Sequence, residues 1–169
     1  FRSKISLLNE KGDILDSIGE FYNLTFNEYT FLKDAYRYLT GIKTNKNKFA
    51  LSYYRTDVIE IYNIDGQFVK AIQGPDNFDV EPYPSEKNKT EYFRSTKRTK
   101  EAFIEIKTTD KYIYALYDGK SVDKPEPVGK WIFVFDWNGN PIKSLKLSEG
   151  INVFEVDENN EKIYAVSLL

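Results

Sequence analysis

Apolar and polar positions along the chain repeat around three glycines. Before each glycine stand apolar residues and an Asn or Asp, and after it come further apolar residues, a charge and a small residue. The three copies align without gaps at 5–18, 59–72 and 132–145. Since Asp65-Gly66 and Asn138-Gly139 are favoured pairs for tight turns with positive φ, each copy predicts a β-hairpin.

A second pattern, a short strand, a polar turn and a more apolar strand, precedes the hairpins. It is clear at 103–116 and 154–166, and a worn copy lies at 42–51. With the strands of a four-stranded blade named A to D, the chain reads CD, ABCD, ABCD, AB. The sequence therefore predicts an all-β fold with about three blades of a β-propeller, whose complete ring we expect to have six blades.

The middle strands distinguish a propeller from a twisted sandwich, which is the alternative fold. Segments 113–117 and 131–135 are apolar on both faces, whereas a half-solvated antiparallel strand alternates. The D strands carry Lys70, Lys143 and Pro141, which belong at sheet edges. The residues that we expect to be almost fully buried are Ile61, Ile113, Leu116, Ile132, Val134 and Ile163.

We expect a single propeller portion in which short turns share one face and long loops share the other. The predicted blade parts are 1–18, 36–72, 101–147 and 150–169, with long loops at 19–35, 73–100 and 118–130. Antiparallel strands place the B–C and D–A loops together, so all three long loops fall on one face. Loops often carry function, so this face is the expected binding site. Its candidate ligand-binding residues are Phe21, Tyr22, Phe26, Tyr29, Tyr83, Tyr92, Arg94 and Arg98.

Composition narrows the chemistry further. The 169 residues include 13 Tyr and 12 Phe, which favour pleated surfaces, and the net charge of −2 argues against a general nucleic-acid binder. There is no Cys and no His, which removes thiol chemistry and the commonest general base. The longest apolar run, 131–135, is far shorter than the roughly 20 residues of a membrane-spanning helix. We expect no cofactor and no catalytic residues.

The strand-pair and hairpin patterns resemble those of the NHL-type six-bladed propellers. These have a V-x-V-D then I-Y-V strand pair and an I-x-V-F-D-x-x-G hairpin. The matching segments are 154–165 and 132–144. The sequence is also similar to the TolB-like propellers of Bacteroides-type bacteria. The resemblance implies a non-enzymatic ligand- or protein-binding propeller of the cell envelope, in the periplasm or as a cell-surface lipoprotein. The Pro-x-Gly and Asn-x-Arg phrases of NHL repeats and the Ser-Pro…Asp-Gly phrase of TolB are absent, so no partner-binding residue carries over.

An enzymatic alternative comes from calcium-dependent lactonases on six-bladed scaffolds, which use oxygen ligands in the axial channel. We expect Glu105 and Glu155 to occupy equivalent positions on innermost strands, with Gly41 in the first copy, and carboxylates suit Ca²⁺. Three blades do not close a ring, so the remaining blades are expected from the same polypeptide or from a second copy. A start at Phe1 without any Met favours a portion of a longer chain.

Overall fold

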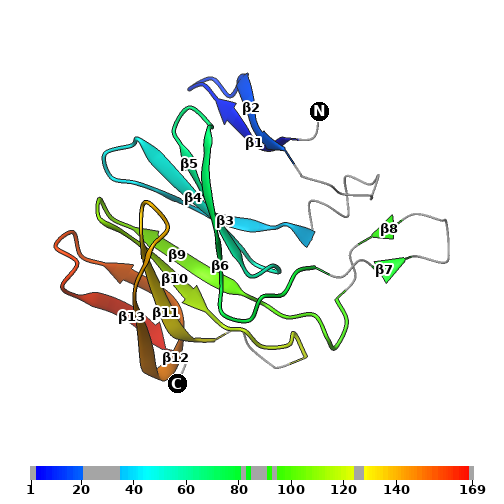
Figure 1. The fold of residues 1–169 in the computed structure, drawn as a ribbon, viewed down its shortest axis with the longest axis vertical. Coiled ribbons are helices and arrows are strands. Elements are labelled where there is room, and N and C mark those ends of the chain that lie inside the picture. Colours follow the sequence, from blue (N-terminus) through cyan, green and yellow to red (C-terminus); the bar gives the residue numbers. More distant parts are fainter. Residues whose placement is uncertain are drawn as a thin grey trace.

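The computed structural model describes residues 3–20, 35–80, 83–84, 91–92, 95–123 and 128–167. The elements with assigned bounds are all strands, and their sheets fan out one behind another (Figure 1). The first sheet pairs β1 (Ser3–Leu8) with β2 (Ile14–Glu20). The second has the order β3 (Tyr38–Ile42), β4 (Lys48–Tyr53), β5 (Val58–Asn63) and β6 (Phe68–Gln73).

The third sheet contains β9 (Phe103–Thr108), β10 (Tyr112–Tyr117), β11 (Gly129–Asp136), β12 (Pro141–Val156) and β13 (Ile163–Ser167). Its β12 is one continuous strand of 16 residues, which serves as outer strand of one blade and inner strand of the next. The sequence placed a break at 148–149, where the strand continues. A small separate hairpin pairs β7 (Tyr83–Pro84) with β8 (Glu91–Tyr92).

The three predicted hairpins form with the same internal geometry in three different sheets. Equivalent residues face each other in Ile5↔Ile18, Ile59↔Ile72 and Ile132↔Leu145. The pairing register of each hairpin shifts at the equivalent position. The shifts follow Leu7, Ile61 and Val134. The three turn glycines have φ of 86°, 90° and 76°. The predicted hairpins therefore form, and the turn chemistry fixes both the bend and the register.

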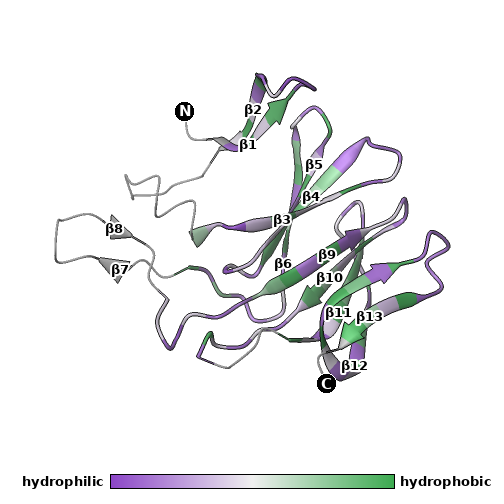
Figure 2. Cartoon of the chain, turned by 180° about the vertical axis from the view of Figure 1, so that it is seen from behind, coloured by the Kyte–Doolittle hydropathy of each residue, from purple (hydrophilic) through white to green (hydrophobic). Residues whose placement is uncertain are grey.

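The sheets pack face to face through the two-sided apolar strands. On β10, Ile113 and Ala115 join the core shared with the second sheet, whereas Tyr114 and Leu116 join the core on the other side. In Figure 2 the apolar stretches, in green, lie within the strands, and the hairpin turns are largely hydrophilic. This two-faced burial confirms the argument that favoured a propeller over a sandwich.

Five of the six predicted core residues are fully buried, and the sixth expectation was wrong. Ile163 is only partly buried, and the next strand positions, Tyr164 and Val166, are 60% and 62% exposed. Ile163 stays partly exposed because β13 is the terminal strand of its sheet and no described sheet packs against it.

The worn copy of the strand pair aligns differently from the expectation. Asn63 and Asp136 are equivalent turn residues, and they pair with Lys48 and Tyr112. Phe49 therefore corresponds to Ile113, whereas the similarity of Phe49-Ala-Leu to Tyr114-Ala-Leu suggests Tyr114, one position later.

Candidate functional site

Among the described residues, the two ends of the blades differ in the length of their connections. The hairpin turns lie at one end, largely on the left of Figure 1, and the long connections lie at the other. The described long connections follow β6 and β10, and the short B–C loop of residues 54–57 lies at the same end. We call this end the long-loop face.

The structure brings few of the predicted ligand-binding residues together. Tyr83 and Tyr92 pair across the β7–β8 ladder. Arg98 is exposed, and its backbone N–H donates to the Thr96 hydroxyl at 3.2 Å. The other predicted residues lie outside the described part of the chain; they are Phe21, Tyr22, Phe26, Tyr29 and Arg94.

Asp57 anchors the base of the longest loop on this face. Its Oδ2 accepts hydrogen bonds from the backbone N–H groups of Asp76 at 2.7 Å and Asn77 at 2.8 Å. Its own backbone N–H donates to the Phe78 carbonyl at 3.0 Å. Asp57 is fully buried, and burial raises its pKa although the two backbone N–H groups act in the opposite direction. The carboxylate therefore holds residues 76–78 against the start of β5.

Gly74 makes this anchor possible. A Cβ atom at position 74 would lie only 1.7 Å from Asp57 Oδ1, so any side chain there would overlap the carboxylate. Oδ1 is buried and accepts no hydrogen bond among the described residues. Asp57 thus acts as a positioning residue for the loop.

Beside the anchor lies a set of paired charges around a buried tyrosine. Burial and then the neighbouring carboxylates of Asp57 and Asp76 raise the pKa of Tyr117. Lys100 Nζ lies 3.7 Å from Asp76 Oδ2, and Lys120 Nζ lies 2.8 Å from the buried Asp118 Oδ1. The floor of the long-loop face is therefore polar and largely charge-compensated. It is suited to hold loops in place and to offer hydrogen bonds at its edge.

Sequence reasoning missed this anchored floor. It gave residues 118–130 only as a long loop, whereas backbone hydrogen bonds join their first part to residues 99–102, including Gly119 N–H to the Glu101 carbonyl at 2.9 Å. The available signals were an Asp directly before a C strand and a Gly directly after a D strand, at Asp57 and Gly74. Both occur only once in the repeat, so the repeat pattern did not reveal them.

The two glutamates of the enzymatic alternative lie on neighbouring innermost strands, but their expected equivalence was wrong. Tyr114 pairs with Lys107 on β9, and the equivalent Tyr164 pairs with Glu155 on β12, so Glu155 occupies the position of Lys107. Lys107 Nζ lies 2.6 Å from Glu155 Oε1 and 4.0 Å from Glu105 Oε1. An ammonium group therefore stands between the two carboxylates.

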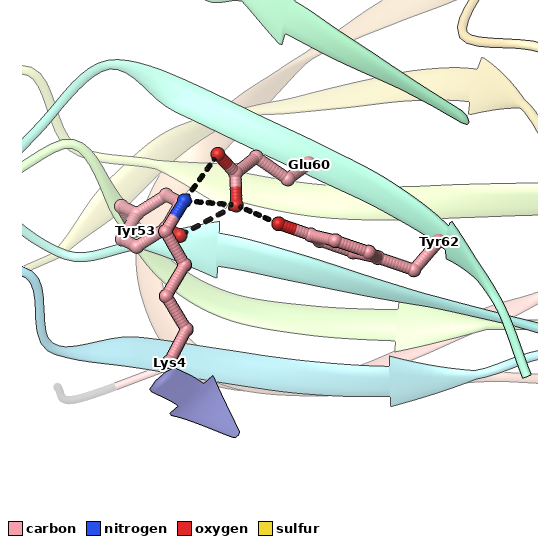
Figure 3. Close-up of polar contacts among 4 residues, drawn as sticks. All are labelled: Lys4, Tyr53, Glu60 and Tyr62. Atoms are coloured by element: carbon pink, nitrogen blue, oxygen red, sulfur yellow. Dashed lines mark hydrogen bonds and ion pairs between the residues drawn. The ribbon is translucent and has the colours of Figure 1, made fainter. Parts of the chain in front are cut away.

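A buried polar cluster joins the first two sheets (Figure 3). Lys4 Nζ donates to both oxygens of Glu60, at 2.7 and 2.9 Å. Glu60 Oε2 also accepts from the hydroxyls of Tyr53 at 2.6 Å and Tyr62 at 2.8 Å. The Lys4 and Glu60 side chains are only 7% and 11% exposed, so the cluster connects blades and is closed to a ligand.

Two further features bear on function. Within the described segments, no group of three or more Asp or Glu side chains is arranged to hold a metal ion. In the same segments, no helix is both long and apolar enough to cross a membrane.

Antiparallel sheets that stack face to face, with β9 in contact with both β3 and β12, define a β-propeller. The chain belongs to the TolB-like 6-blade propeller-like family, whose model matches residues 2–159. Among solved structures it is similar to one described as "Structure of Dos1 propeller", with 11% identity and a TM-score of 0.44. That match covers 79% of this chain and 29% of the other, so this chain spans well under two thirds of its length. No curated protein matches the sequence.

Proposed function

We propose that this protein is a non-enzymatic binding propeller that contacts a ligand or a partner protein through its long-loop face. The observation that carries the proposal is the anchor at Asp57, whose Oδ2 accepts two backbone N–H groups at the base of the loop that contains β7 and β8. A loop that is long but fixed at its base loses less conformational entropy on binding than a free one. Such a loop is a good binding element on a rigid scaffold.

The proposed setting is the bacterial cell envelope, with the protein in the periplasm or carried on the surface as a lipoprotein. This rests on the resemblance of the strand phrases at 132–144 and 154–165 to NHL-type and TolB-like propellers of Bacteroides-type bacteria. Fractionation of cells into periplasm, membrane and cytoplasm, followed by detection of the protein, tests the setting directly.

The alternative of a calcium-dependent lactonase is not favoured by the charges near the axis. The Lys107 ammonium already neutralises Glu155 at 2.6 Å, and a cation bound there would have to displace it. A calcium-dependent rise in Tm that is abolished by Glu155→Gln would reinstate the enzymatic function.

Site-specific photo-crosslinking in the native cell tests the binding face. A benzoylphenylalanine at Arg98, exposed on the long-loop face, should capture a discrete partner or ligand. The matched control is the same group at Asn138, which is exposed on a hairpin turn. Adducts that form at Asn138 but not at Arg98 would reverse the assignment of faces.

A further inference from the structure

A groove of about 320 Å³ lies at the opposite end of the blades from the long-loop face. One wall is the middle of β2 with Asp16 and Ile18, and the other is the β5–β6 turn with Asp65 and Gly66. The rings of Tyr62 and Phe68 complete it. Its volume is at the lower end of the range for small-ligand sites, about 300–1,000 Å³.

The repeat supplies an equivalent groove between the second and third blades, because the hairpins align without gaps. Lys70 there takes the place of Asp16, Ile72 that of Ile18, and Gly139 that of Gly66. A Cβ atom at Gly139 would lie 2.9 Å from Lys70 Cδ and 3.4 Å from its Cε. The alkyl chain of Lys70 therefore lies across Gly139 and fills this second groove.

The Lys70 ammonium also acts on the wall of the second groove. Burial by itself would raise the pKa of Asp136. Hydrogen bonds from the turn and the positive charge of Lys70 outweigh burial and lower this pKa. The second groove thus contains its own alkylammonium chain, which lies against Gly139.

In the first groove the same space is open and its charge is reversed. The three atoms nearest to a Cβ atom at Gly66 would all belong to Ile18. Asp16, which is shorter than Lys70, does not extend across the turn. Asp16 Oδ1 accepts from the Ser17 N–H at 2.7 Å, and Asp65 Oδ1 accepts from the Gln67 N–H at 3.0 Å. The second oxygen of each carboxylate has no partner within the described segments.

The aromatic wall suits the same chemistry. Phe68 is 43% exposed, and its ring meets the Tyr62 ring edge to face at a centroid distance of 5.6 Å. An ammonium group near an aromatic ring and two carboxylates gains cation–π and charge-assisted hydrogen-bond energy.

We propose that the groove between β2 and the β5–β6 turn binds an alkylammonium group from outside the chain, in the place that Lys70 fills in the next groove. The Asp16 and Asp65 carboxylates accept from the ammonium, and the alkyl chain lies along Ile18 over Gly66. This site is separate from the long-loop face, so it stands whether or not the proposed function holds.

The test is an NMR titration of the ¹⁵N-labelled protein with Nα-acetyl-lysine methylamide. The backbone signals of Gly66 and Gly19 should shift and saturate, with weaker binding at higher salt. The Nε-acetylated probe, which is neutral, should give no saturable shift. Equal shifts with the neutral probe would overturn the proposal, and so would an absence of saturable shifts with the charged one.

Reciprocal substitutions make the test specific. Asp16→Lys gives the first groove the residue of the second and should weaken binding at least tenfold. Lys70→Asp should open the second groove and produce new shifts at Gly139. Glu158→Lys makes the same charge change on another turn and should bind as the wild type does. Unchanged binding in Asp16→Lys would contradict the proposal.

Two measurements complete the design. Asp16→Asn removes the charge without filling the groove and should also weaken binding, which covers the case in which Asp16→Lys does not fold. A lysine-containing peptide and a free diamine, compared as probes, distinguish the sources of the ammonium. Tighter binding of the peptide assigns the site to a partner's side chain, and tighter binding of the diamine assigns it to a small amine.

Discussion

The ammonium of Lys4 lies 2.7 Å from a carboxylate oxygen of Glu60, and this ion pair joins the first sheet to the second. The equivalent of Glu60 in the third blade is Phe133, whose ring contacts the Tyr117 ring at a centroid distance of 5.5 Å. The interface between the first and second sheets is therefore polar at the position where the third sheet carries an aromatic contact. The hydroxyls of Tyr53 and Tyr62 satisfy the carboxylate and make the polar version possible.

The first prediction concerns the two halves of this pair. Lys4→Met should lower the free energy of unfolding by about 3–5 kcal/mol, because it leaves the Glu60 carboxylate buried without its counter-charge. The double variant Lys4→Met, Glu60→Leu should recover most of that loss, since it removes the orphaned charge as well. Urea unfolding of the wild type and the two variants measures both effects. A double variant no more stable than Lys4→Met would contradict this account.

The second prediction separates backbone strain from packing at the turn glycines. Gly12 and Gly66 have φ of 86° and 90°, so an alanine at either position carries about 1–2 kcal/mol of left-handed strain. A Cβ atom at Gly12 has open space, but one at Gly66 would lie 2.7 Å from Ile18 Cγ2. Gly66→Ala should therefore lower Tm more than Gly12→Ala, as measured by thermal unfolding. Equal losses would show that the contact with Ile18 relaxes freely.

The third prediction compares buried and terminal positions of the same residue type. Ile132 is fully buried between sheets, whereas Ile163 on the terminal strand is partly exposed. Ile132→Ala should cost about 2–5 kcal/mol, because it removes apolar contacts on a fully packed site and leaves a cavity. Ile163→Ala should cost clearly less in the same urea experiment. A similar cost at both positions would mean that β13 is packed in solution.

The hairpins were predictable because their determinants are local. A positive-φ glycine, a preceding Asn or Asp and an apolar run together fix turn and register, and the side-chain bonds agree. Asn9 Oδ1 accepts from the Lys11 N–H and Asp136 Oδ1 from the Asn138 N–H, both at 2.9 Å. Two-faced apolar strands likewise predicted the stacking of sheets.

What the sequence did not reveal depends on contacts between distant segments. Lys4 and Glu60 are 56 residues apart, and neither position carries a local signal for the other. The worn copy was misaligned by one residue because Phe49-Ala-Leu resembles Tyr114-Ala-Leu, although Phe49 and Ile113 hold the equivalent pairing positions. The turn between β12 and β13 is longer than the turn between β9 and β10, so counting back from Tyr114 and Tyr164 made Glu105 and Glu155 look equivalent. The binding face was inferred from loop length, but the anchor at Asp57 required the structure.

The last prediction concerns the pH dependence of this anchor. Burial raises the pKa of Asp57 above its ordinary value in the folded state. The protonated form is then favoured by folding, so its contribution to stability is full below the pKa of the unfolded chain and is lost as pH rises through the folded pKa. Asp57→Asn keeps an oxygen acceptor for the N–H groups of Asp76 and Asn77 but does not titrate.

The free energy of unfolding of the wild type should therefore fall more steeply than that of Asp57→Asn as pH rises from about 4 towards neutrality. Asp57→Ala removes the acceptor and should be less stable by about 1–3 kcal/mol at every pH, because two buried N–H groups lose their partner. The matched control is Asp110→Asn, a carboxylate on an exposed turn that also accepts from a backbone N–H, at 2.9 Å. Urea unfolding at several pH values compares the four proteins. Parallel pH profiles for the wild type and Asp57→Asn would show that the buried carboxylate is not the titrating group.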